Sequence, residues 1–356
     1  MAPIQGLTGF GGGATGNLVR GGAEPIVPFT LTLESNNNSR NGDTISVQNT
    51  WWGTQTYDAT FITNIGQQTY TGYYAFTAGK DATLTATIGG AAGWRNIRGR
   101  SITATFSIST GDRIVFFAGK PTQPTGSEGA AGGASCLMKY DTSLSSDADY
   151  ANGFVPLIIA AGGGEGGTST QYELSSAAPP LTTTINNTSS SIMTARNNFV
   201  PNANLVAKEG GAGRDNSAQQ GGCGWKGPSR ISDNTGSGNA TTSSVGLAYG
   251  AQGNIASSGA TGGFGGGGAG RTGNFYGAGA GGYYGGCEGT GASSNNTTYV
   301  AYSINGGDVA DDKLGALSFV HSSGSSVTDN GLHGTSNLNN TTTSQQIYGK
   351  VQLNFT

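Results

Sequence analysis

The residue types that most often perform catalysis are sparse in this chain. Its two histidines, His321 and His333, do not stand beside a recognisable nucleophile motif. Asp308, Asp311 and Asp312 form an acidic cluster that could attract Ca²⁺, but the cluster lacks the spacing of a calcium-binding loop. A solvated turn is the simpler interpretation. We therefore predict a protein that is not an enzyme and that uses no metal ion and no other cofactor.

A phosphate site is the next chemistry that the sequence could offer. The run 163–167, Gly-Gly-Glu-Gly-Gly, follows an apolar strand candidate, as in a nucleotide-binding fingerprint. No amphipathic helix follows the run, and a P-loop Lys-Ser/Thr is absent, so the helix dipole that would hold the anion is missing. The pattern does not indicate a nucleotide.

Three cysteines lie far apart in the chain, at Cys136, Cys223 and Cys287. With almost no histidine and no C-x-x-C pair, they do not have the spacing of a metal site. Two alternatives stay open. The cysteines form one disulfide and leave one thiol, or all three are reduced and pack as small hydrophobic residues.

The charge of the chain argues against a nucleic-acid partner. Its net charge is −3 and its pI is about 5.4, without the clustered basic residues of nucleic-acid-binding proteins. The start has no basic segment followed by an apolar one, and no run approaches the about 18 apolar residues of a membrane span. We expect a chain made in a cytoplasm without a signal peptide and without membrane insertion.

Glycine dominates the composition, at 65 of 356 residues, against about 7% in average proteins. Glycine loses much backbone entropy on folding, so an ordered glycine tract needs close backbone packing to offset that loss. Extended glycine helices of the polyproline-II type have three residues per turn and no internal hydrogen bonds, so neighbouring copies must supply the partners. The tracts are interrupted by aromatic residues, singly or in adjacent pairs, which argues against a flexible tail: Trp225, Phe264, Phe275, Tyr276, Tyr283 and Tyr284.

Outside the glycine tracts, the pattern is that of β-strands. Apolar and polar residues alternate in short runs that are separated by turn-forming residues, and helix signals are scarce. This pattern predicts an all-β protein with a TNF-like or jelly-roll β-sandwich that carries an inserted polyglycine II helix bundle. The predicted strands are 29–34, 44–48, 68–76, 82–88, 101–108, 113–118, 154–161, 298–304, 315–321 and 346–355.

The same pattern divides the chain into four parts. Residues 1–24 have no strand or helix period and are predicted to be a docking arm or linker. Residues 25–125 carry the first sandwich strands, and 126–297 form the glycine-rich insertion with its loops. Residues 298–356 supply the strands that complete the sandwich, with Greek-key connections expected.

A series of segments in one order is more specific than any single glycine run. The segments are GYYAFTAGKDATLTATIGGAAG (72–93), GDRIVFFAGK (111–120), VPLIIAAGGGEGG (155–167), GGCGWKG (221–227), GATGGFGGGGAG (259–270), GAGAGGYYGG (277–286), GALSFV (315–320) and GKVQLNF (349–355). The series resembles the glycine-rich extracellular domain of the anaplastic lymphoma kinase and leukocyte tyrosine kinase receptors. That resemblance implies a TNF-like sandwich with polyglycine helices in a hexagonal array. Cytokine binding is not implied, because the chain lacks the receptors' signal, membrane span, kinase and cysteine pattern.

The beginning of the chain has a second resemblance. A short Gly/Ala arm, MAPIQGLTGFGGGATGN, that leads into polar all-β and glycine-rich modules is similar to the virion proteins of tailed phages. This resemblance implies that the arm docks to other virion or tail proteins, with Ile4, Leu7 and Phe10 as its apolar contacts, and that the protein is located in the virion.

The aromatic residues of the glycine tracts have two interpretations. Tyr and Trp rings give large contact areas and stack on sugar faces, which favours contact with a host surface glycan or protein through Phe275, Tyr276, Tyr283 and Tyr284. The alternative is structural packing between the sheet and the glycine helices. We favour that alternative for Phe264, and it stays open for the four others.

The sequence therefore predicts a non-enzymatic virion structural protein, a tail fibre or tip adhesin, that is attached by its arm and contacts the host through the glycine-rich module. Two alternatives remain. One is a head-decoration or self-assembling fibril protein with the same fold, and the other is a spike that hydrolyses glycans. A homo-oligomer, by analogy a trimer, is expected.

Overall fold

A computed structural model describes residues 29–34, 44–48, 72–93, 98–121, 131–145, 150–164, 181–182, 222–225, 246–249, 262–268, 279–283, 285, 316, 318–334 and 347–356. Several predictions lie outside these residues. They are the docking arm with Ile4, Leu7 and Phe10, the strand 298–304, and the predicted host contacts Phe275, Tyr276 and Tyr284.

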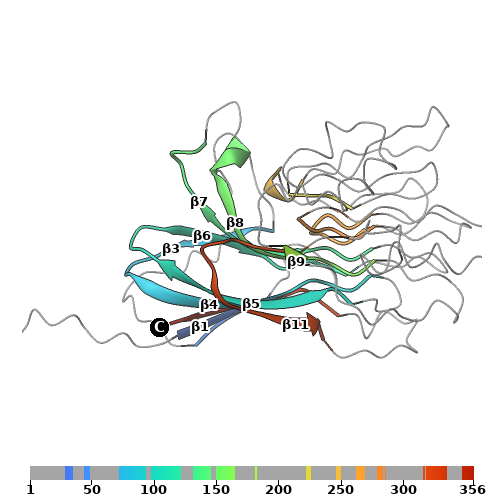
Figure 1. Cartoon of the computed structure of the whole chain (residues 1–356), viewed down its shortest axis with the longest axis horizontal. Coiled ribbons are helices and arrows are strands. Elements are labelled where there is room, and N and C mark those ends of the chain that lie inside the picture. The colour runs from blue at the N-terminus through green and yellow to red at the C-terminus, as the bar shows by residue number, and fades with distance from the viewer. Residues whose placement is uncertain are drawn as a thin grey trace, which may run out of the picture.

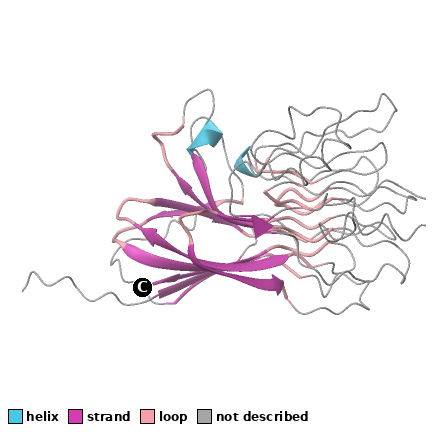
Figure 2. Ribbon diagram, viewed as in Figure 1, coloured by secondary structure: helices cyan, strands magenta, loops and turns pink. Residues whose placement is uncertain are grey.

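The described strands form two six-stranded sheets that stack face to face (Figures 1 and 2). All neighbouring strands are antiparallel except β10 and β9. The predicted all-β sandwich is confirmed.

Sheet A consists, in spatial order, of β11 (Ser325–Leu332), β5 (Arg100–Ile108), β4 (Ala82–Gly89), β12 (Lys350–Phe355), β1 (Phe29–Glu34) and β2 (Thr44–Gln48). Sheet B consists of β3 (Tyr74–Thr77), β6 (Arg113–Phe117), β7 (Ser135–Tyr140), β8 (Phe154–Ala160), β10 (Ser318–Val320) and β9 (Leu181–Thr182).

Sheet A has one buried face and one face toward solvent. In β12, buried and half-buried residues alternate without exception, as period-2 patterning requires when only one face meets a core. The outward face of the central strands carries hydroxyl groups. Thr85 and Thr105 are 3.1 Å apart across β4 and β5, and Thr87 and Thr103 are 2.8 Å apart. These cross-strand pairs stabilise the register of the sheet.

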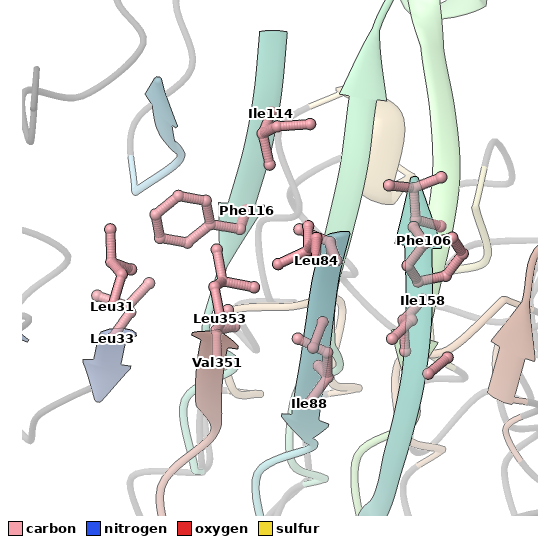
Figure 3. Packing of buried hydrophobic residues seen from close by; sticks show 14 of the residues in the cluster. Leu31, Leu33, Leu84, Ile88, Phe106, Ile114, Phe116, Ile158, Val351 and Leu353 are labelled. Atoms are coloured by element: carbon pink, nitrogen blue, oxygen red, sulfur yellow. The ribbon is translucent and has the colours of Figure 1, made fainter. Parts of the chain in front are cut away.

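The space between the two sheets is filled by aliphatic and aromatic side chains from both (Figure 3). Burial of one such side chain contributes about 1.5–3 kcal/mol, so this core supplies most of the hydrophobic stabilisation of the sandwich. The residues labelled in Figure 3 are Leu31, Leu33, Leu84, Ile88, Phe106, Ile114, Phe116, Ile158, Val351 and Leu353.

Sheet B is buried on both faces, unlike sheet A. Its second face carries a separate apolar cluster that includes Val115, Phe117, Met138 and Ile159, and residues from the glycine-rich segments cover them. A strand that is buried on both faces reads as a continuous apolar run. This explains why β6 and β8 show little alternation.

Most predicted strands are present, and three others were not predicted. The predicted strands 29–34 and 44–48 are β1 and β2, which form an antiparallel pair from Thr30↔Gln48 to Glu34↔Thr44. The unpredicted strands are β7, β9 and β11. Both β7 and β8 lie within 126–297, so the sandwich continues into the range that the sequence assigns to the glycine-rich insertion. The C-terminal strands β10 and β12 occupy interior positions of the two sheets.

The sandwich has two different ends. At the entry end, Phe29 of β1 pairs with Phe355 of β12, and β4 begins at Ala82. At the opposite end, Glu34 pairs with Lys350 of β12, which also pairs with Gly89 of β4. We call this second end the glycine end, because the strands lead there into glycine-rich segments. Figure 1 marks the C-terminus at the entry end, away from the glycine-rich segments.

A buried serine joins the two sheets at the glycine end. Ser135 Oγ donates a hydrogen bond to the Gly89 carbonyl of sheet A at 2.6 Å and accepts one from the Gly119 amide at 2.9 Å. We expect Ser135→Ala to lower the free energy of unfolding by about 1–3 kcal/mol, because both buried backbone groups lose a hydrogen bond. Urea unfolding followed by circular dichroism measures the change. Ser107→Ala on the exposed face of β5 is the control, with an effect within about 0.5 kcal/mol; an equal effect of the two substitutions would contradict this role of Ser135.

Candidate functional site

Most of the long connections of the sandwich leave it at the glycine end. They are 35–43, 90–99, 118–134, 161–317, which contains β9, and 333–349. At the entry end, the connections 78–81, 109–112 and 321–324 are short turns. The connection 141–153 between β7 and β8 also lies there and is longer, and the connection 49–73 begins there after β2. Loops that a rigid scaffold gathers at one end of a sandwich are the usual place for binding residues. The glycine end is therefore the candidate functional site.

Glycine-rich segments at this end are joined by backbone hydrogen bonds in more than one direction. The segment 131–134 exchanges such bonds with five others: 90–93, 118–121, 161–164, 262–268 and 279–283. Gly132 N donates to Gly163 O at 2.8 Å, and Ala134 N donates to Gly265 O at 2.8 Å. A β-strand has only two hydrogen-bonded neighbours, so this arrangement is not a sheet. The polyglycine II helix bundle stays a prediction.

Backbone-to-backbone packing at this end excludes side chains. A Cβ atom at Gly133 would meet the Phe264 carbonyl, one at Gly281 the Gly265 carbonyl, and one at Gly222 the Ala280 carbonyl, each closer than 3.0 Å. Real Cβ atoms essentially never come so close to another heavy atom. These glycines are required by sterics, since a larger residue would push two segments apart and break their hydrogen bonds.

Aromatic side chains anchor the glycine-rich segments onto sheet B. Phe264 is 5% exposed, and its ring centroid lies 5.3 Å from that of Phe117 on β6. Trp225 is fully buried in the same cluster. Both side chains fill the space between the sheet and the glycine-rich segments, which confirms the structural interpretation of Phe264.

The prediction that Tyr283 contacts a host surface is wrong. Its side chain is fully buried, and its ring stacks on Phe319 of β10 with centroids 4.5 Å apart and an interplanar angle of 18°. The ring gains more from covering the second face of sheet B than from exposure to water. Tyr283 is therefore an anchor.

A further anchor was not predicted. Tyr73, just before β3, is fully buried, and its hydroxyl donates a hydrogen bond to the carbonyl of Leu247, at the start of the short 3₁₀ helix η6 (Leu247–Tyr249). This bond ties η6 to the sheet. The two adjacent tyrosines in the run GYYAF indicate this anchor, since successive positions of a strand that is buried on both faces point into different cores.

The structure places a serine beside one of the histidines. In the turn after β10, the Ser323 amide donates to His321 Nδ1 at 3.1 Å, and Ser323 Oγ lies 2.8 Å from the same nitrogen. Within the described residues, no carboxylate bonds His321 to complete a triad. The bonds close a turn at the entry end, away from the candidate site.

The described residues also contain no group of three His, Cys, Asp or Glu side chains that could hold a metal ion, and Asp308, Asp311 and Asp312 lie outside them.

His333 holds two connections together at the glycine end. Its amide donates to Gly99 O at 2.8 Å, and its Nε2 lies 3.0 Å from Tyr348 O, so this nitrogen carries the proton. The ring packs against Gly89, where a Cβ would collide with it. Burial is the main cause that lowers the pKa of His333, and nearby Lys350 acts in the same direction; the bond to Tyr348 and the charge of Glu34 oppose it in part.

This lowered pKa predicts a stability that depends on pH. Above about pH 6.5, His333 is neutral in both the folded and the unfolded chain, so its titration does not change the free energy of unfolding. As the pH falls below 6.5, the unfolded chain binds the proton more readily, so the free energy of unfolding decreases, by at most about 1.4 kcal/mol per pH unit. Urea unfolding at several pH values between 7 and 5 measures the slope. His333→Gln should reduce the slope, whereas His321, whose pKa burial also lowers, should account for part of the rest. An unchanged slope in His333→Gln would contradict the prediction.

Cys136 and Cys223 are buried, reduced thiols. Burial raises the pKa of the Cys136 thiol well above its usual range, so the thiol stays protonated and unreactive. Both residues belong to or contact the cluster between sheet B and the glycine-rich segments. For these two residues, the alternative of small hydrophobic packing is confirmed, and Cys287 lies outside the described residues.

Comparison with models of known protein families and with curated proteins found no match to this chain. Within its described part, no helix has the length and apolar character needed to cross a membrane. The interpretation of the site therefore depends on its own geometry.

Proposed function

We propose that the chain is a non-enzymatic virion structural protein, a tail fibre or tip adhesin, that docks to the particle through its N-terminal arm and contacts the host surface with its glycine end. The observation that carries the proposal is the polarity of the sandwich. The chain enters β1 at Phe29, at the entry end, and most of the long connections, including the longest, 161–317, leave at the opposite end. A protein that bridges a particle and a host needs this separation of its attachment point from its recognition loops.

The hydrogen bonds of the segment 131–134 support a rigid platform for those loops. We propose that the described glycine-rich segments belong to a polyglycine II bundle, because such helices direct their amides and carbonyls to several neighbours around the axis. Rigidity that comes from backbone hydrogen bonds leaves the sequence of the connecting loops free to vary. Phe275, Tyr276 and Tyr284 remain the proposed host contacts, whereas Tyr283 is excluded by its burial.

Blocking one end at a time tests this proposal. We would replace Glu34, exposed at the glycine end, or Ser323, exposed at the entry end, with cysteine, and attach biotin and then streptavidin. Host cells would be incubated with each full-length protein, washed, and challenged with phage. We expect the unblocked and Ser323-blocked proteins to reduce adsorption and the Glu34-blocked protein to have no effect. Wild-type protein given the same treatment controls for the native thiols.

Two outcomes would contradict the proposal. One is that no form reduces adsorption at saturating protein, and the other is that only the Ser323 block removes competition. Immunogold labelling of intact particles gives an independent test, since gold over the head instead of the tail would indicate decoration. A reducing-sugar assay on host glycans tests the alternative of a hydrolytic spike.

Two of the four edge strands, β11 and β9, argue against the fibril alternative. At one edge of sheet A, β11 shows two register shifts, between Ser325 and Thr328 and between Asp329 and Gly331. At one edge of sheet B, β9 has only two residues. Irregular, charged or very short edge strands prevent edge-to-edge pairing with another copy. We expect gel filtration at high protein concentration to give a defined oligomer, and continuous polymer in the absence of host would favour the fibril alternative.

A further inference from the structure

We propose that the ladder between β1 and β12 is the mechanical clamp of the molecule, through which tension passes from the N-terminal arm to the glycine end. The direction of the tension rests on the proposed function. The resistance of the ladder to force does not rest on the proposed function, because it is a property of the folded chain alone.

The two strands are paired along their whole length. Register runs from Phe29↔Phe355 to Glu34↔Lys350 without a shift. Two side-chain contacts tie the ends of the ladder: Thr30 Oγ1 donates to Asn354 Oδ1 at 2.8 Å, and Lys350 Nζ lies 2.8 Å from a Glu34 carboxylate oxygen.

Both strands are also held by their neighbours. On its other side, β12 pairs with β4 over six consecutive positions, from Lys350↔Gly89 to Phe355↔Leu84. Leu31 and Leu33 of β1 are 1% and 0% exposed in the core between the sheets. Movement of β1 along its axis would therefore drag these side chains through a packed core, which adds to the resistance.

The direction of pulling decides how the ladder breaks. Tension on the residues before Phe29 pulls β1 from the entry end, while tension at the glycine end pulls β12 through the residues before Lys350. The antiparallel strands are then pulled from opposite ends, so all hydrogen bonds of the ladder carry the force together. If the chain is pulled through Phe29 and Phe355, which face each other at the entry end, the bonds break one after another.

Single-molecule force spectroscopy on the purified full-length chain compares these two directions. One form carries ligation tags at the N-terminus and within 335–346, and the other carries tags at the two termini. Rupture under force reports the unfolding barrier, which depends on direction when the loaded bonds differ. We expect a several-fold higher rupture force for the first form at the same loading rate. Equal forces, or a lower force in the first form, would overturn the proposal.

A reversible cross-link identifies the ladder as the site of rupture. Thr30 and Asn354 face each other across it, within the reach of a disulfide after substitution of both by cysteine. In the first tagging geometry, we expect the rupture peak of this variant to disappear when it is oxidised and to return after reduction. A peak that does not change would show that the chain yields elsewhere. The force experiment contains no host. Equal rupture forces in the two directions would therefore not change the adsorption result, and a protein that fails to reduce adsorption could still show the expected ratio of rupture forces.

Discussion

Replacement of Gly133 by alanine is expected to cost more than about 4 kcal/mol of folding free energy and to leave little folded protein. The added Cβ would collide with the carbonyl of Phe264, a backbone atom that cannot rotate away. Gly133 also donates a hydrogen bond to Lys120 and accepts one from Ala91, so a shift of the segment breaks bonds on two sides. Urea unfolding of the purified variant, or its yield in the soluble fraction, measures the loss.

Gly111 provides the matched control. It lies in the turn between β5 and β6 at the entry end, has φ +88°, and would have no heavy atom within 4 Å of an added Cβ. Asparagine tolerates the left-handed region better than other residues that carry a Cβ, so Gly111→Asn should cost less than about 1 kcal/mol. If both glycine substitutions had the same small effect, close backbone packing would not be what stabilises the glycine end.

Trp225→Ala is expected to lower the free energy of unfolding by about 3–5 kcal/mol, because it opens a cavity between sheet B and the glycine-rich segments. Trp225 is fully buried among the aromatic anchors, and its amide donates to Tyr283 O at 2.9 Å. Urea unfolding followed by circular dichroism gives the value. The same variant should lose competition for host adsorption if the anchored segments position the recognition loops.

Trp225→Phe separates packing from hydrogen bonding at the same position. Within the described residues, the indole nitrogen Nε1 is buried and has no hydrogen-bond partner. Phenylalanine keeps an aromatic ring and removes this unpaired donor, which offsets part of the lost packing, so we expect a loss below about 2 kcal/mol. Equal losses for the alanine and phenylalanine variants would contradict a role of the ring in packing.

Most of sheet A could be predicted because one of its faces meets water. The alternation in β4, β5 and β12 reports directly which side chains are buried, and those predicted strands agree with the structure within two residues, apart from an earlier predicted start for β12. In sheet B, β7 was missed, since the run Ser-Cys-Leu-Met-Lys-Tyr has no alternation when almost every position is buried. β11 was missed for the opposite reason, because its exposed polar residues provide no apolar face.

The candidate site could be predicted only in part. The glycine content correctly indicated close backbone packing, and the position of Phe264 between two glycine tracts correctly indicated an anchor. Tyr283 was misassigned because the residue type is the same for a ring that binds sugar and a ring that covers a sheet. Its partner, Phe319, lies far along the chain, and only tertiary structure brings the two rings together.

The position of β12 also determines when the protein can fold. β12 lies between β4 and β1, and its pairing of Phe355 with Phe29 joins residues that are separated by almost the whole chain. During synthesis, β1 and β4 leave the ribosome long before the strand that must separate them, so sheet A cannot close until β12 has emerged. Pairing over such a distance is slow. A chain truncated before β12 would keep β1 without its partner, so only copies that contain β12 could present a properly folded body behind the proposed arm.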